Sequence, residues 1–173
     1  VMLHVLYAEE DKSLAGCAEF LAHPDRTITQ TIQMMKTTQH LVAANGKSRV
    51  HPYVARGARA MMSKSENERS GVLSTTLTLL EVFSDPIIAD LTSTSDWGVM
   101  DLVEAPRPVS LYLVVPPSDI SRTRPLMRLI LNQVGRRLTE RLPDPGRRKV
   151  LLMLDEFPAL GRLDFFETAL AFL

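Results

Sequence analysis

Two long apolar runs in the second half of the chain restrict its fold most. Residues 109–116 read VSLYLVVP and residues 150–154 read VLLML. Near-continuous runs of this kind are typical of strands that are covered on both faces. Between them, residues 125–142 repeat apolar side chains at helical spacing. A strand, a helix of about five turns and a second strand predict a right-handed crossover with parallel strands. We therefore expect an α/β fold over residues 93–173.

The first half of the chain follows a different pattern. Apolar residues recur there at three- and four-residue spacing in segments 12–22, 27–42, 53–62 and 70–83. Pro24 and Pro86 interrupt this pattern, and Gly46 suits the left-handed end of a helix. These features predict an all-α domain over residues 1–92.

Composition excludes several classes of protein. Twenty basic residues balance twenty acidic ones, so the net charge gives no argument for a nucleic-acid or membrane partner. The single cysteine, Cys17, rules out an intramolecular disulfide, and the four histidines lack the spacing of zinc ligands. No apolar run approaches the ~20 residues of a membrane-spanning helix. The chain begins at Val1 without a methionine and ends within a helical pattern, so we expect it to be part of a longer protein.

Two adjacent acids, Asp155 and Glu156, end the second apolar run. Ligands of open parallel sheets bind at the carboxyl ends of strands. Four or more apolar residues followed by Asp-Glu is the Walker B pattern of nucleotide-hydrolysing enzymes. In that interpretation Asp155 holds Mg²⁺ through a water, and Glu156 orients or deprotonates the attacking water. The alternative is an exposed strand end without a catalytic role, because so short a pattern often arises by chance.

The phosphate-binding loop that should accompany Walker B has no good match. Gly46, Lys47 and Ser48 fit the end of the G-x-x-x-x-G-K-[ST] pattern, but Leu41 stands where its first glycine belongs. The preceding residues look helical, whereas this loop follows a strand. We therefore reject this segment as a phosphate site and expect the chain alone to hydrolyse nothing.

A basic stretch runs from Ser121 to Lys149. It holds nine basic and two acidic residues, a net of +7 in a neutral chain. The basic residues are Arg122, Arg124, Arg128, Arg136, Arg137, Arg141, Arg147, Arg148 and Lys149. Arg136 and Arg137 are candidates for contact with DNA or with a neighbouring subunit's phosphates. The stretch equally fits the solvated side of an amphipathic helix and its exit loop.

Longer motifs carry a more specific resemblance. The segment DEFPALG (155–161), followed by LDFFE (163–167), resembles the TraG-type coupling proteins of conjugative type IV secretion systems. Residues 4–21 and 68–86 are similar to the same family. The resemblance implies a partial RecA-like P-loop ATPase domain preceded by an all-α helical domain that faces the substrate. It also implies that Asp155 is the Mg²⁺-associated acid and that Glu156 is the catalytic acid.

The resemblance implies partners and cofactors as well. The whole protein would be a homo-hexameric ATPase using ATP and Mg²⁺, anchored in the bacterial inner membrane, with this part cytoplasmic. It would recruit the relaxase, relaxosome accessory proteins and single-stranded DNA, and deliver them to the type IV secretion channel. The membrane anchor, the Walker A loop and a polar sensor region would lie outside these residues. We therefore expect no ATP or Mg²⁺ to be bound by this chain alone.

Three alternatives remain at this point. The helical half could be a non-catalytic module that recognises relaxase or accessory proteins. The chain could belong to a DNA pump of the FtsK type, which shares the RecA-like core. It could also be an unrelated α/β domain with a chance acidic strand end.

Overall fold

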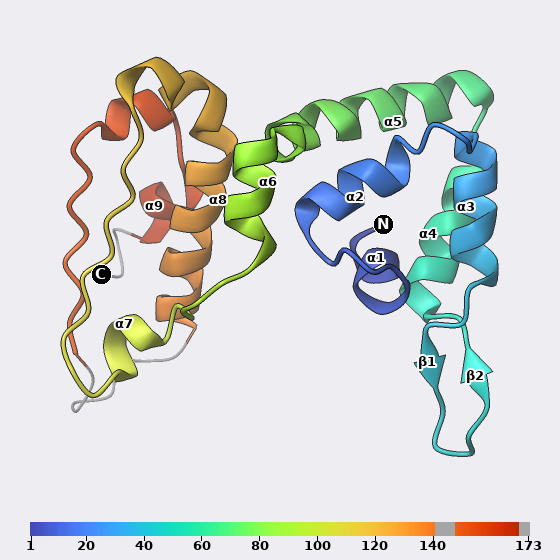
Figure 1. Ribbon diagram of the computed structural model, residues 1–173, viewed down its shortest axis with the longest axis horizontal. Coiled ribbons are helices and arrows are strands. Elements are labelled where there is room, and N and C mark those ends of the chain that lie inside the picture. The colour runs from blue at the N-terminus through green and yellow to red at the C-terminus, as the bar shows by residue number, and fades with distance from the viewer. Residues whose placement is uncertain (141–147, 170–173) are drawn as a thin grey trace. The chain divides into compact units, whose positions relative to one another are not determined.

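The computed structural model describes residues 1–140 and 148–169. The chain divides into two compact units, Val1–Thr94 and Ser95–Leu173. In Figure 1 the first unit runs from blue to green and the second from yellow to red. The functions expected for residues 1–92 and 93–173 stay predictions.

The first unit is helical except for one short hairpin. Its elements are α1 (Met2–Ala8), α2 (Leu14–Leu21), α3 (Ile28–Thr37), β1 (Leu41–Val42), β2 (Ser48–Arg49), α4 (Pro52–Met62), α5 (Glu66–Leu80), the 3-10 turn η1 (Glu81–Ser84) and α6 (Pro86–Ser93). Side-chain caps fix where several helices begin, because they satisfy the free main-chain N–H groups of the first turn. Thr27 with Gln30, and Ser65 with Glu68, form capping boxes at α3 and α5.

The β-hairpin replaces the predicted end of a helix. The segment expected to be helical through residue 42 ends its helix at Thr37, and β1 then pairs antiparallel with β2. Gly46 adopts φ 77° in the hairpin turn, and the Asn45 side chain accepts a hydrogen bond from the Lys47 N–H at 3.1 Å. Asn-Gly is a strong hairpin signal, so the sequence carried this information. The prediction of a helix end at Gly46 was wrong.

The core of the first unit lies between its helices. Its buried apolar residues are Val5, Cys17, Phe20, Ile32, Met35, Val54 and Ala58. In Figure 1, α3 and α4 lie side by side, and α5 extends above α2. Although the sequence gives α5 a broad apolar stripe, none of its residues is buried. The partly buried Leu80 packs against this core, so α5 contributes to it at its C-terminal end.

The second unit is built around one long helix. Its elements are α7 (Asp101–Glu104), η2 (Pro117–Asp119), α8 (Ile120–Thr139), η3 (Phe157–Leu160) and α9 (Asp164–Ala169). Leu131 of α8 forms a small buried cluster with Leu163 and Phe166. The sequence DPG at residues 144–146, a turn signal, lies outside the described residues.

The predicted α/β fold class is wrong for this structure. Residues 108–116 and 148–154 have neither helical nor strand hydrogen bonding, and within the described ranges the only sheet is the antiparallel pair β1–β2. No parallel sheet and no RecA-like core forms in the described part of the chain. A short apolar run favours a strand. A strand forms, however, only where its main-chain N–H and C=O groups find a partner strand. Periodicity does not reveal whether that partner is present.

Within the described residues, none of the helices by itself has both the length and the hydropathy that a membrane span requires. Residues Glu66–Ser84 and Pro86–Ser93 reach that length and hydropathy only together, and the pair bends by 80° at its break.

Candidate acidic site and its surroundings

Asp155 and Glu156 form a turn between the extended segment and η3. Both acids are exposed, while their neighbours Leu154 and Phe157 pack against the cluster on α8. The local sequence therefore partly buries the apolar residues on either side and leaves the two carboxylates at the surface. This turn is the position where the sequence predicted the Walker B acids.

Arg128 fixes the loop that follows the acids. Its Nη1 donates a hydrogen bond of 2.7 Å to the carbonyl oxygen of Leu160, at the end of η3. Gly161 comes next, with φ 68°, a conformation that favours glycine. Sequence analysis counted Arg128 only as part of the basic stretch. No local pattern in the sequence signals this contact, because Arg128 and Leu160 lie 32 residues apart.

The donors of the acidic turn fit magnesium bound together with phosphate. The Asp155 and Glu156 side chains make no hydrogen bond or ion pair with other residues of the described ranges. Those ranges contain no group of three His, Cys, Asp or Glu that could hold a metal by itself. Mg²⁺ usually takes one or two carboxylates and completes its shell with water and substrate phosphates. Two free carboxylates therefore suit a magnesium–nucleotide complex better than a metal held by protein alone.

The candidate DNA-contact residues are exposed and have partners inside the second unit. The Arg136 guanidinium lies 5.5 Å from the centroid of the Phe165 ring. Nη1 of Arg137 lies 2.5 Å from the Glu140 carboxylate. Both contacts are local and exposed, so they cost little to exchange for another anion. The role of Arg136 and Arg137 in DNA contact stays a prediction.

The rest of the basic stretch is only partly described. Arg141 and Arg147 lie outside the described residues. Arg148 donates hydrogen bonds to the carbonyl oxygens of Ala105, Pro106 and Arg107. This arginine therefore links the two extended segments of the second unit, because residues 105–107 precede the first and Arg148 begins the second.

The rejected phosphate loop lies in the hairpin. Gly46 forms the turn, Lys47 follows it and Ser48 begins β2. A phosphate-binding loop connects a strand to the N-terminus of a helix, where free N–H groups meet the anion. The hairpin lacks that arrangement.

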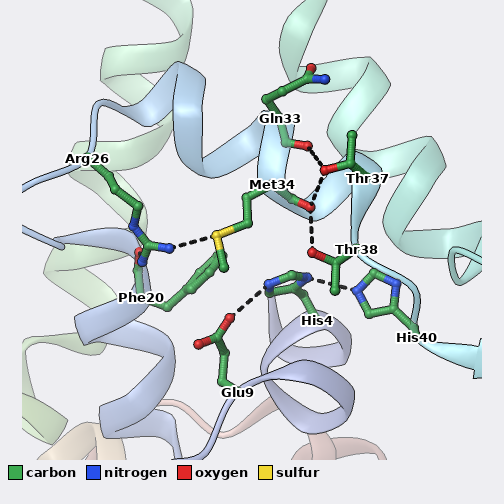
Figure 2. A network of polar contacts seen from close by, with 9 residues as sticks. All are labelled: His4, Glu9, Phe20, Arg26, Gln33, Met34, Thr37, Thr38 and His40. Carbon is green, nitrogen blue, oxygen red and sulfur yellow. Dashed lines mark hydrogen bonds and ion pairs between the residues drawn. The ribbon is translucent and has the colours of Figure 1, made fainter.

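A buried polar network in the first unit was missed by sequence analysis. Figure 2 shows His4 between His40 and Glu9: its Nδ1 lies 2.8 Å from Nε2 of His40, and its Nε2 lies 3.1 Å from the Glu9 carboxylate. The main-chain N–H of His51 donates to Nδ1 of His40 at 3.2 Å. Since an N–H can only donate, His40 must donate from Nε2 to His4, and His4 must donate from Nε2 to Glu9. One proton arrangement thus satisfies every member, with both imidazoles neutral.

Burial reinforces this neutral state. It lowers the pKa of His4, an effect that the hydrogen bond to Glu9 opposes and His40 strengthens. Burial also lowers the pKa of His40, and His51 adds to that shift. The network joins residues distant in sequence, so histidine spacing alone could not reveal it.

An open groove lies along α5 in the first unit. It has a volume of about 850 Å³ and is lined by residues of α2, α5, η1 and the start of α6. Leu73 and Leu77 provide apolar lining, while Glu19 and Glu81 add negative charge. The apolar stripe predicted on α5 therefore faces this groove in part.

Comparison with known proteins first defines the class, which is that of type IV secretion proteins. Residues 1–173 match the family described as "Type IV secretory system Conjugative DNA transfer". The chain belongs to this family. The resemblance drawn from DEFPALG and its companion motifs is thus confirmed.

Individual relatives agree with this assignment. The chain is 37% identical to an Escherichia coli protein named conjugal transfer protein TraG, over 183 aligned residues that cover 99% of this chain and 28% of that protein. It is 41% identical to protein VirD4 of Agrobacterium fabrum over 92 residues, which cover 53% of this chain and 14% of the relative. No solved structure matches the chain. The chain thus spans about a quarter of the length of its TraG relatives.

Proposed function

We propose that this chain is part of a coupling ATPase that recruits relaxase-bound DNA and delivers it to a type IV secretion channel. The observation that carries the proposal is the exposed DEFPALG turn in a chain that matches the conjugative DNA transfer family along its whole length. The proposal includes relaxase and relaxosome accessory proteins as partners, and a homo-hexamer as the working state of the whole protein. The family match favours it over an FtsK-type pump and over an unrelated α/β domain.

The proposed chemistry uses each acid of the turn differently. Mg²⁺, when bound with ATP, supplies neutralisation of the phosphate charge. Asp155 would hold the ion through a water. Glu156 would accept a hydrogen bond from the attacking water and take up its proton. The partly buried neighbours Leu154 and Phe157 would keep the two carboxylates at a fixed separation.

The test is ATP hydrolysis by the full-length protein, with and without single-stranded DNA. In Glu156→Gln the side chain keeps its size but loses its basicity, so kcat should fall by about 10²- to 10⁴-fold while ATP still binds. Asp155→Asn should instead raise the Mg²⁺ concentration needed for half-maximal turnover. Glu104→Gln is the matched control, because Glu104 is an exposed glutamate of the same unit and lies on α7.

The outcomes separate the assignments. DNA-stimulated turnover that disappears in Glu156→Gln supports the proposal. Turnover that is unchanged in Glu156→Gln would assign the catalytic acid to another residue. No turnover in the wild-type protein, with nucleotide still bound, would contradict the ATPase and favour a recruiting platform.

A second candidate function is supported by the groove along α5. The first unit would act as a non-catalytic module that binds a relaxase or an accessory protein, with Leu73 and Leu77 providing apolar contact. Leu73→Ser together with Leu77→Ser should abolish binding of a purified relaxase in a pull-down without unfolding the unit, because neither leucine is buried. Exposed Leu79→Ser on the same helix is the control. Equal binding by all variants would contradict this function.

A further inference from the structure

The charges of the first unit are segregated along the chain. From Arg26 to Ser65 there are seven basic residues and no Asp or Glu. The remaining residues of Val1–Thr94 carry ten acidic residues against Lys12 and Arg69. The acid-free segment forms α3, the β-hairpin and α4. A neutral overall charge thus conceals a strongly positive part of the molecule, which attracts anions.

Four of these basic residues are exposed near the hairpin. Lys47 and Arg49 lie on the hairpin, and Arg56 and Arg59 lie on the exposed side of α4. The hairpin projects from the N-terminal end of α4 (Figure 1). No carboxylate of the described ranges forms an ion pair with these four side chains. They therefore remain available to an external anion.

Two tyrosine rings lie next to the His51 ring, close to these charges. The His51 ring lies 5.7 Å from the Tyr7 ring and 5.9 Å from the Tyr53 ring, measured between centroids. The Arg56 guanidinium lies 4.7 Å from the centroid of Tyr53. Tyr53 is 64% exposed and Tyr7 is 48% exposed. Large exposed rings with an arginine stacked on one of them are what a base-stacking surface requires.

From these observations we infer that the hairpin and the start of α4 bind single-stranded nucleic acid. Lys47, Arg49, Arg56 and Arg59 contact the phosphates, and Tyr53 stacks on a base with Arg56 beside it. An acidic protein segment would use the charges without the rings, whereas a single strand presents both phosphates and unpaired bases. Glu9, Glu10 and Asp11 follow α1 in sequence and carry negative charge, so the phosphate contacts are assigned to the acid-free segment. The inference depends on the family's part in DNA transfer and is independent of the acidic turn.

The test measures binding of a fluorescein-labelled oligothymidylate to the full chain by anisotropy over a range of salt concentrations. Tyr53→Ala should weaken binding about tenfold through lost stacking, and Tyr53→Phe should restore it. Arg56→Gln should flatten the slope of log affinity against log salt by about 0.7, the value for one phosphate contact on a single strand. Lys12→Gln is the matched control, an exposed cation outside the acid-free segment.

The same titration in an Arg136→Gln, Arg137→Gln background removes the contribution of α8, and circular dichroism checks that each variant is folded. Loss of binding in Tyr53→Ala in both backgrounds supports the inference. Equal affinity of Tyr53→Ala and wild type would overturn it, as would an unchanged salt slope in Arg56→Gln. Displacement of the oligonucleotide by polyglutamate or by phosphatidylserine vesicles at equal charge concentration would also overturn it, in favour of a protein or a membrane surface.

Discussion

The two units differ in how far their apolar side chains are buried. In the first unit, Val5, Phe20 and Ala58 are no more than 3% exposed and belong to one continuous cluster. In the second unit, the extended segments leave Tyr112, Val114 and Met153 more than 80% exposed. Only the small cluster on α8 buries apolar residues of the DEFPALG loop.

This difference follows from how the two kinds of backbone satisfy their hydrogen bonds. A helix pairs its N–H and C=O groups within itself, so neighbouring helices can pack as soon as their apolar faces meet. An extended segment must find its partners on another strand. The second unit therefore combines a well-packed helix with two extended segments whose apolar side chains stay at the surface.

The sharpest contrast between the units comes from removing an aromatic ring from each. Phe20→Ala should destabilise the first unit by about 3–5 kcal/mol, because the ring is buried and contacts both His4 and Arg26. Tyr112→Ala should change the stability of the second unit by less than about 0.5 kcal/mol, because its side chain is exposed. Urea unfolding, monitored by hydrogen exchange in each unit, measures both changes in stability. A large effect of Tyr112→Ala would mean that the second unit has a core that these contacts do not show.

The histidine network should make the first unit sensitive to acid. Both folded-state pKa values are lowered, so the unfolded chain binds more protons below the ordinary histidine pKa of about 6.5. Stability should be full above that pH and should fall as the pH drops toward the lower folded pKa values. His40→Ala should cost about 2–3 kcal/mol at neutral pH, because it leaves Nδ1 of His4 and the His51 N–H without partners.

The measurement is the free energy of unfolding of the first unit between about pH 5 and pH 8, a range that spans the ordinary histidine pKa. His40→Ala should show a flatter pH dependence than wild type. His23→Ala serves as the control, because His23 only accepts one exposed hydrogen bond from the Asp25 N–H. A wild-type stability that does not fall on acidification would contradict neutral, buried imidazoles.

How much the sequence could predict depends on whether the signal was local. Helical periodicity located the segments that became α2, α4 and α8, whereas the roles of Asp155 and Glu156 stay predictions. The contact of His4 with His40 and the fixing of Leu160 by Arg128 could not be predicted. These contacts join residues that are distant in sequence and share no repeating pattern.

The parallel sheet failed for a related reason. The runs at 109–116 and 150–154 predicted two strands, and the structure has no strand hydrogen bonding in either run. Pairing depends on a second segment in the correct place and register, which no local property of either run specifies. The hairpin error was different, because Asn45-Gly46 was a local signal that the helical pattern before it obscured.

Replacing one glycine in each unit by alanine compares how tightly α8 and α4 are packed. A Cβ on Gly135 of α8 would lie 2.3 Å from the Phe165 ring, whereas a Cβ on Gly57 of α4 meets nothing within 4 Å. Alanine gains about 1 kcal/mol of helix propensity at either position. Steric crowding should lower the stability of Gly135→Ala by about 1–3 kcal/mol and should leave Gly57→Ala unaffected. The stabilities of the two variants should therefore differ by that amount. Thermal unfolding of each unit checks this, and equal effects would show that α9 does not pack firmly on α8.

The smallest expected effect concerns Arg128, which connects the ordered helix of the second unit to its acidic turn. Arg128→Gln loses a charge-assisted hydrogen bond to the Leu160 carbonyl and should cost about 1 kcal/mol, because the contact is only half-buried. Arg124→Gln is the control, since Arg124 is exposed on the same helix. Hydrogen exchange should quicken at the Gly161 amide, which donates to Pro158 within the same loop, while exchange in α8 stays unchanged. Faster exchange across the whole of α8 would instead make Arg128 part of the general packing of the helix. Unchanged exchange at every amide would show that Leu154 and Phe157 are sufficient to hold the acidic turn in place.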